Sequence, residues 1–297
     1  MEGVIEMEKL LEVCNISKTF KDFKLQDVSF TLPKGFIMGY VGRNGAGKTT
    51  TINLISHICN PQTGTVKLDG ITYEEDPIRY KEMIGFVGDE SYFPKEFNLK
   101  DVKKVMKDCY RTFDEQRFNE LVTHWNLPEK LKIEKYSRGM KVKLMFACTL
   151  SRETKLLILD EATNGLDPLM REEVLNLLQE YIADGEKSIL FSTHMLNDLE
   201  LIADYIVFIE NGKIIINDTK DELLESYIQV KGSNDELSES IRKKAIGLTK
   251  KEFGFEALLE TNDALGLSNK FVVEKPSIDQ IMIYILRNKG VTSYESM

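Results

Sequence analysis

Short apolar runs separated by turn residues characterise the first part of the chain. Three of these runs, at residues 10–16, 25–32 and 36–41, have the length and composition of strands, and the third follows a Pro-Lys-Gly turn. From residue 47 to 58 the apolar positions recur at helical spacing, and the sequence at residues 60–64, Asn-Pro-Gln-Thr-Gly, then ends the helix. The pattern predicts a strand, a glycine-rich loop and a helix in succession.

No strand pattern occurs between residues 100 and 150. Residues 101–111 and 114–125 instead have the periodicity of amphipathic helices. We therefore predict a helical insert at about residues 95–150.

The strand pattern returns after the insert and has a different character. Fully apolar strands at residues 156–159 and 188–191 are separated by a predicted helix at 168–182, and another helix is expected near 196–203. Strands without polar alternation, separated by helices, are typical of a parallel sheet covered on both faces. The expected fold class is α/β, a mostly parallel sheet covered by helices, with an N-terminal antiparallel β subdomain.

The end of the chain is less regular. Residues 205–209 and 213–216 flank Asn211-Gly212, a dipeptide that favours a tight hairpin turn. The pattern weakens beyond about residue 226, and the polar, acidic residues 233–240 indicate a boundary or linker. We predict a main domain at residues 8–226.

The remaining residues, 227–297, are predicted to form a small accessory region. An amphipathic helix is expected near its end, at about residues 278–286. The sequence assigns no role to this region, which could stabilise a dimer, contact a regulator or cover the sheet.

Composition narrows the classes of partner. The 297 residues include 39 Lys and Arg and 48 Asp and Glu. The resulting net charge of −9 disfavours binding to nucleic acid or anionic lipid that is mainly electrostatic. The four cysteines lie far apart without a C-x-x-C spacing, so we expect reduced thiols in the cytosol. Neither a signal peptide nor an apolar run of membrane-spanning length is present, so a soluble chain is expected unless a partner holds it at a membrane.

The glycine-rich loop carries the most specific motif. Residues 42–49 fit the pattern G-x-x-x-x-G-K-[ST], with a predicted strand before them and a helix after them. Backbone amides and a helix N-terminus attract phosphate, Lys48 supplies a charge for the β and γ phosphates, and Thr49 offers a hydroxyl to Mg²⁺. The residues expected to bind ATP are Gly42, Arg43, Asn44, Gly45, Ala46, Gly47, Lys48, Thr49 and Thr50.

Two carboxylates end the strand at residues 156–159. Ligand sites of open α/β sheets lie at the carboxyl ends of strands. Taken alone, two acids after a strand indicate a solvated loop, but the phosphate loop favours a catalytic interpretation. Asp160 is expected to bind Mg²⁺ through water, and Glu161 to orient and deprotonate the attacking water.

With these motifs in this order, roughly residues 10–218 resemble the ATP-binding domains of the ABC family. The sequence Tyr-Ser-Arg-Gly-Met-Lys at residues 136–141 resembles the family signature L-S-G-G-Q, with Arg138 in place of the first glycine. Ser137 can cap a helix and Gly139 allows close approach to a phosphate. The resemblance implies that Ser137, Arg138, Gly139 and Met140 contact the nucleotide held by a second ATP-binding protomer.

Other residues match further family positions. Asp167 lies in the segment that resembles the D-loop at the dimer interface, and it is also a good helix N-cap before Pro168, two compatible roles. His194 matches the switch histidine that senses the γ-phosphate. Phe20 lies where the family stacks an aromatic ring on adenine, with Phe23 as a second candidate and core packing as the alternative.

Asp89 departs from the family pattern. It aligns with a glutamine that touches Mg²⁺ and relays nucleotide state to the membrane partner. A carboxylate can bind Mg²⁺ but cannot donate an amide hydrogen bond, so tighter metal binding or different coupling is expected.

The resemblance implies an ATPase, with ATP and Mg²⁺ as cofactors, that drives a membrane transporter. The signature variant and the helix start at residues 276–279 resemble the branch that exports drugs, peptides or antibiotics. The expected partners are separate transmembrane subunits and a second ATP-binding protomer, identical or paralogous, and no nucleic acid. The expected location is cytoplasmic, at the inner face of the cell membrane.

The alternatives are a soluble ABC ATPase without a transport role and a regulatory half-site with weak hydrolysis. Apolar residues at 92–94 and Phe97 are candidates for the surface that docks the membrane subunits, with packing inside the insert as the alternative.

Overall fold

The computed structural model describes residues 7–88, 90–264 and 270–288. The chain forms two compact units. The first comprises the described residues of Met1–His194 and Val207–Asn217, and the second those of Met195–Ile206 and Asp218–Met297. The chain therefore leaves the first unit after His194 and returns to it for a single hairpin.

An antiparallel sheet opens the first unit. It has the order β2-β1-β4 and consists of β1 (Lys9–Thr19), β2 (Lys24–Pro33) and β4 (Thr63–Leu68). The strands predicted at residues 10–16 and 25–32 are confirmed as parts of β1 and β2. The sequence pattern did not predict β4, because only Val66 and Leu68 of its residues are buried and apolar.

A six-stranded sheet forms the centre of the first unit. Its order is β5-β6-β7-β3-β8-β9, and β5, β6, β7 and β3 pair in parallel. The strands are β3 (Ile37–Val41), β5 (Ile84–Gly88), β6 (Leu156–Asp160), β7 (Ser188–Ser192), β8 (Tyr205–Glu210) and β9 (Lys213–Thr219). Because Gly88 pairs with Asp160 and Asp160 with Ser192, the carboxyl ends of neighbouring strands meet at one edge.

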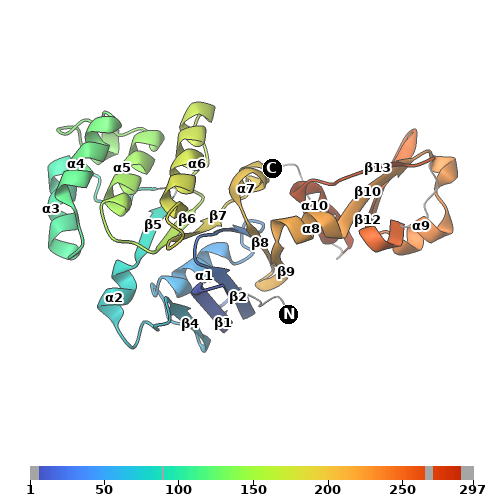
Figure 1. Ribbon diagram of the computed structural model, residues 1–297, viewed down its shortest axis with the longest axis horizontal. Coiled ribbons are helices and arrows are strands. Elements are labelled where there is room, and N and C mark those ends of the chain that lie inside the picture. The colour runs from blue at the N-terminus through green and yellow to red at the C-terminus, as the bar shows by residue number, and fades with distance from the viewer. Residues whose placement is uncertain (1–6, 89, 265–269, 289–297) are drawn as a thin grey trace. The chain divides into compact units, whose positions relative to one another are not determined.

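Helices flank this sheet and form the insert. The helices of the first unit are α1 (Lys48–Ile55), α2 (Pro77–Glu82), α3 (Leu99–Cys109), α4 (Glu115–His124), the short η1 (Ile133–Lys135), α5 (Arg138–Leu150) and α6 (Pro168–Ile182). α1 ends before the predicted residue 58, because His57 adopts a positive φ of 49° and Ile58 is exposed. α3, α4 and α5 lie side by side (Figure 1), as the predicted insert requires.

The aromatic residues before α3 divide between two environments. Phe93 is buried in the core of the insert and Phe97 packs against that core. Tyr92 is 53% exposed. The packing alternative therefore holds for the two phenylalanines, while Tyr92 stays a candidate for the docking surface.

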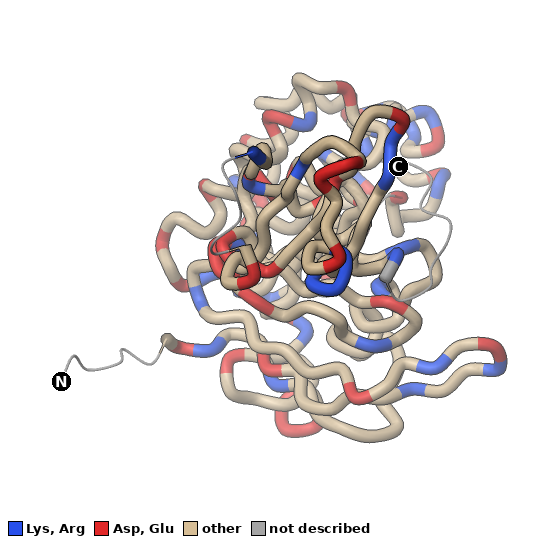
Figure 2. Tube along the Cα trace, turned by 90° about the vertical axis from the view of Figure 1, so that its right-hand side faces the viewer, with Lys and Arg blue, Asp and Glu red and all other residues tan. Residues whose placement is uncertain are grey.

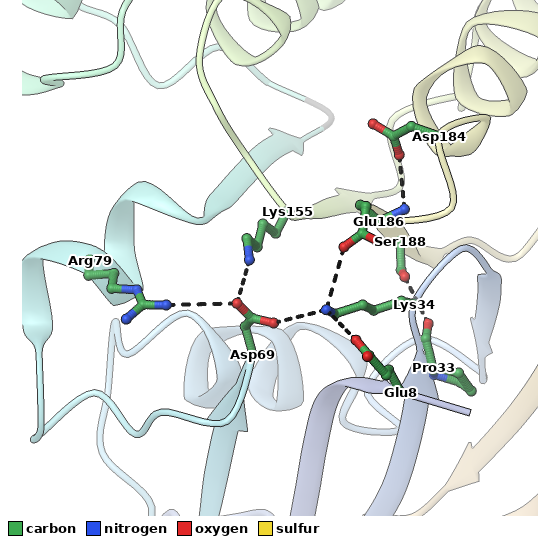
Figure 3. A network of polar contacts seen from close by, with 9 residues as sticks. All are labelled: Glu8, Pro33, Lys34, Asp69, Arg79, Lys155, Asp184, Glu186 and Ser188. Carbon is green, nitrogen blue, oxygen red and sulfur yellow. Dashed lines mark hydrogen bonds and ion pairs between the residues drawn. The ribbon is translucent and has the colours of Figure 1, made fainter. Parts of the chain in front are cut away.

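A network of ion pairs joins the antiparallel sheet to the central sheet (Figure 3). Lys34 Nζ lies 2.7 Å from Glu8 Oε2 and 3.5 Å from both Asp69 Oδ1 and Glu186 Oε2. Lys155 donates a hydrogen bond to Asp69, which is 15% exposed. Burial alone would raise the pKa of the Asp69 carboxyl, but Lys155 and Lys34 hold that pKa below its ordinary value. The network therefore stabilises the first unit through ionised Asp69.

Asp69→Asn is expected to lower the free energy of unfolding by about 1–3 kcal/mol at pH 7, because Lys155 loses its carboxylate partner and Lys34 loses one of its three. Since the pKa is lower in the folded than in the unfolded protein, this contribution is complete above the unfolded pKa and disappears as the pH falls through the folded value. Urea unfolding at pH 7 and at lower pH measures the difference, with exposed Asp108→Asn as the control. An equal difference at every pH would contradict the role of the charge.

The second unit combines an antiparallel sheet with short helices. The sheet has the order β11-β12-β10-β13. The elements of the second unit are α7 (Leu196–Ile202), α8 (Lys220–Ser226), β10 (Tyr227–Gly232), η2 (Asn234–Glu236), α9 (Glu239–Lys244), β11 (Gly247–Lys251), β12 (Gly254–Glu260), η3 (Thr261–Ala264), β13 (Val272–Glu274) and α10 (Ile278–Asn288). The predicted amphipathic helix near the end of the chain is confirmed as α10.

The prediction of a linker at residues 233–240 is wrong, because these residues are folded. Ser233 and Glu236 form a capping box around η2, and Ser238 caps α9. Leu237 and Ile241 are buried in the core of this unit. The polar residues that resembled a linker are therefore helix caps. The functional boundary at residues 226/227 stays a prediction.

The described residues contain no helix that is both long enough and apolar enough to cross a bilayer. On the side displayed in Figure 2, segments of Lys and Arg alternate with segments of Asp and Glu. Such interspersed charges favour local ion pairs.

Candidate functional site

The phosphate loop connects β3 to α1 at the edge where the parallel strands end. Gly42 packs so closely against β8 that a Cβ atom in its place would lie 2.4 Å from the carbonyl oxygen of Ile209. Gly47 has a φ of +119°, and a Cβ there would lie 2.9 Å from Phe23 Cζ. Both positions therefore require glycine, because the loop backbone is pressed against its neighbours.

Lys48, the first residue of α1, is 6% exposed. Its Nζ donates a hydrogen bond to the Gly42 carbonyl oxygen at 2.7 Å and lies 3.3 Å from Glu161 Oε1. The ammonium group therefore lies within the loop and also contacts the carboxylate of Glu161, the residue that follows β6. A phosphate group at the loop would compete with that carboxylate for the same cation.

Asp160 and Thr49 form a pair of oxygen donors beside Lys48. The Thr49 hydroxyl donates to Asp160 Oδ2 at 3.1 Å. Asp160 Oδ1 is buried and makes no hydrogen bond of ordinary geometry within the described residues. Burial raises the pKa of this carboxyl, although the hydroxyls of Ser192 and Thr49 oppose the shift. An unsatisfied buried carboxylate oxygen beside a hydroxyl suits a hard divalent cation, so these residues fit Mg²⁺.

Glu161 follows β6 in an unusual conformation. Its φ is 55°, a left-handed value that is uncommon for a residue with a side chain. Its Oε2 accepts hydrogen bonds from Asn164 Nδ2 at 2.6 Å and from His194 Nδ1 at 2.7 Å. Burial alone would raise the pKa of Glu161, but the charge of Lys48 and these two hydrogen bonds hold it below its ordinary value. Glu161 is therefore an oriented, ionised carboxylate.

His194 lies just beyond β7 and shares the oxygen with Asn164. Because an ionised carboxylate only accepts hydrogen bonds, the Nδ1 of His194 carries the proton in this contact. In the neutral ring, Nε2 is then an acceptor. The other two histidines lie elsewhere, and His57 stacks on the ring of Tyr73.

A cleft of about 590 Å³ opens beside the loop. It is lined by Phe20, Asp22, Phe23, Arg43, Asn44, Gly45, Gly47, Lys48, Thr49, Thr50 and Glu161. Phe20 is 44% exposed, whereas Phe23 is partly buried against Gly47. The geometry favours Phe20 as the ring free to stack on a base, with Phe23 supporting the loop.

The signature residues do not line this cleft. Ser137 caps α5 by accepting a hydrogen bond from the Met140 N–H at 3.2 Å. The Arg138 side chain passes close to Gly165, where an added Cβ would lie 3.4 Å from Nη1. Asp167 accepts a hydrogen bond from the Met170 N–H and caps α6. The contacts predicted between these residues and a second protomer therefore stay predictions.

Asn164 and Asp89 differ from the other residues singled out from the sequence. Asn164 begins the segment at residues 164–167 that resembles the D-loop, but the sequence predicts no contact for it within this site, whereas the structure places it against both Glu161 and His194. Asp89, predicted to bind metal, lies outside the described residues.

Comparisons with known proteins bear on the fold and the family of this chain. The ABC transporter family model matches residues 25–164. The ABC transporter ATP-binding protein YtrB of Bacillus subtilis (strain 168) is 32% identical over 239 residues, which cover 80% of this chain and 82% of the relative. The lantibiotic transport ATP-binding protein SrtF of Streptococcus pyogenes is 31% identical over 215 residues, covering 71% of this chain and 92% of the relative.

A solved structure of an ATP binding subunit of an ABC transporter is also similar. It overlaps with a TM-score of 0.66 and 29% identity, covering 72% of this chain and 91% of the other. The expected fold class and the resemblance found from the motifs are thereby confirmed.

Proposed function

Since this chain belongs to the ABC transporter family of ATP-binding proteins, we propose that it powers the export of drugs, peptides or antibiotics. The protein binds and hydrolyses ATP as the motor subunit of a membrane transporter. The similarity to SrtF, which is named for lantibiotic transport, supports a peptide or antibiotic cargo. The relatives named above are transport proteins and so give no support to the soluble, non-transport alternative.

One observation carries the assignment of the site. The phosphate loop, Lys48, Asp160 and an ionised Glu161 converge where the parallel strands end. Lys48 binds the β and γ phosphates, and the surrounding backbone amides hold the remaining oxygens. Glu161 then orients the attacking water and takes its proton. His194 would donate a hydrogen bond from Nε2–H to the γ-phosphate, a contact that requires protons on both ring nitrogens while Nδ1 donates to Glu161. The arrangement favours phosphoryl transfer to water.

Thr49 and Asp160 would hold Mg²⁺, and Asp89 is a further candidate from the sequence. When bound, Mg²⁺ neutralises charge that develops on the β and γ phosphates during transfer. Thr49 would present its hydroxyl oxygen to the metal, and Asp160 would hold it through water.

ABC ATP-binding subunits work with transmembrane partners and form dimers. We propose that separate transmembrane subunits bind this chain and hold it at the inner face of the cell membrane. A second protomer, identical or paralogous, would present Ser137, Arg138, Gly139 and Met140 to the nucleotide, with Asp167 at the interface. ATP would close this dimer, and phosphate loss would reopen it. Coupling requires that ATP binds the closed state more tightly.

Phosphate release by the purified protein tests the proposal, with size measured by light scattering. With Mg²⁺ and ATP, we expect continuous phosphate release, and EDTA in excess is expected to lower the rate by roughly 10²-fold or more because the metal supplies much of the charge stabilisation. Restoring Mg²⁺ should restore the rate, which controls for damage by the chelator. Binding of ATP without any release would instead favour the regulatory half-site.

A further inference from the structure

We propose that Asn164 is a positioning residue that orients Glu161 for hydrolysis, an inference that rests on the proposed role of Glu161 as the base. Asn164 lies in the loop between β6 and α6. Its Nδ2 donates to Glu161 Oε2 at 2.6 Å, while His194 Nδ1 lies 2.7 Å from the same oxygen. Two donors from different segments thus converge on one carboxylate oxygen and restrict the rotation of the carboxyl group.

The two oxygens of Glu161 consequently have different tasks. Oε2 is occupied by the two donors, whereas Oε1 faces Lys48 Nζ at 3.3 Å. When Lys48 turns to the phosphates of ATP, Oε1 loses its partner and is able to accept a proton from water. Asn164 retains its hold on Oε2 throughout, because this contact does not involve Lys48. The carboxylate therefore keeps one orientation before and after nucleotide binding.

The backbone of the loop gives Asn164 this position. The Asn164 N–H donates to the Glu161 carbonyl oxygen at 3.2 Å and closes a turn. Within that turn Glu161 adopts its left-handed φ of 55°, which costs free energy for any residue with a Cβ atom. Asn164 contacts Glu161 through both its backbone and its side chain, so it also secures the strained conformation.

The amide group of Asn164 turns its Nδ2 toward the Glu161 carboxylate and leaves its Oδ1 without a partner among the described residues. Its Oδ1 is buried and has no hydrogen-bond partner in the part of the chain that the structure describes. The opposite orientation would place Oδ1 against the carboxylate, where two acceptors repel each other. An unpaired buried carbonyl oxygen is unfavourable, and alanine would avoid that penalty. The contribution of this side chain is therefore its Nδ2 donor.

The test is ATP hydrolysis by the full-length protein carrying Asn164→Ala. Because a hydrogen bond to a charged group is lost, we expect kcat to fall roughly 10- to 100-fold. The KM for ATP is expected to stay within about two-fold, since Asn164 does not line the nucleotide cleft. Asn164→Asp keeps the shape of the side chain but removes the donor, so it should lower kcat at least as much. Asn164→Ser, which retains a donor, should recover part of the rate.

A double-mutant cycle separates positioning from a general effect on folding. In single-turnover measurements, Asn164→Ala should lower the wild-type rate but leave the residual rate of Glu161→Gln unchanged, because it acts through that carboxylate. Asn176→Ala, at an exposed position on α6, is the matched control and should leave kcat unchanged. Retained kcat in Asn164→Asp, or an undiminished effect in the Glu161→Gln background, would overturn the inference.

The cycle also distinguishes the two levels of the proposal. If Glu161→Gln hydrolyses ATP at the wild-type rate, Glu161 is not the base and the proposed mechanism fails together with the inference. If Glu161→Gln is inactive but Asn164→Ala has normal kcat, only the role of Asn164 is wrong.

Discussion

Glu161→Gln is expected to lower the rate of ATP hydrolysis by roughly 10²- to 10⁴-fold, the range that general base catalysis contributes. The amide of glutamine keeps the shape of the side chain but cannot take a proton at neutral pH. It also removes the negative charge next to Lys48 Nζ, which lies 3.3 Å from Oε1, so ATP binding should be retained or strengthened. If ATP closes the dimer and hydrolysis reopens it, the variant should accumulate as an ATP-dependent dimer.

Phosphate release and light scattering of the same sample measure both effects. Glu173→Gln is a suitable control, because this glutamate lies on α6 and contacts Lys143 and Trp125 rather than the loop. Hydrolysis at the wild-type rate would exclude Glu161 as the base. If hydrolysis is lost but no ATP-dependent dimer forms, the assignment of Glu161 as the base stands and self-association is refuted. A paralogous partner would then be sought.

The second large effect concerns Lys48→Met. Methionine retains the apolar stem of a side chain that is 6% exposed but removes the charge, so the rate of hydrolysis should fall roughly 10²- to 10³-fold, as for other lost electrostatic contacts in active sites. ATP affinity should fall as well, unlike in Glu161→Gln, because Lys48 binds the phosphates in the ground state. The lost charge is also expected to raise the pKa of Glu161, which Lys48 now lowers.

Fluorescent nucleotide binding separates the two variants, since only Lys48→Met should bind weakly. Lys213→Met, at an exposed position of β9, controls for the change in net charge. Unchanged affinity in Lys48→Met would contradict the assignment of this lysine to the phosphates.

The location of the site was predictable because it depends on local motifs and on strand ends. The phosphate loop, Glu161 and His194 follow three parallel strands, and the carboxyl ends of such strands meet at one edge whatever the intervening loops do. Their proximity follows from the fold class alone. Their chemical roles stay predictions, as does the contribution of the signature residues to a second protomer.

Features that depend on conformation were beyond the sequence. Nothing in the residue order signals the left-handed φ of Glu161, and without it the contact with Asn164 cannot be inferred. The strand β4 is not predicted from the sequence, because a mostly exposed edge strand has little hydrophobic periodicity. The polar residues around Ser233 and Ser238 predict a linker for a related reason, because helix caps and linkers share the same polar composition.

The interleaving of the two units matters for anyone who wishes to express a shorter version of this protein. Helix α7 belongs to the second unit although it precedes the β8–β9 hairpin, and its Glu200 accepts a hydrogen bond from the first residue of α10 at 2.7 Å. A gene truncated after Asn217 would encode α7, which carries the buried apolar residues Leu199 and Ile202, without the α10 helix that contacts it. Such a product should be prone to aggregation. A minimal catalytic fragment therefore needs redesign of α7 as well as a new stop codon.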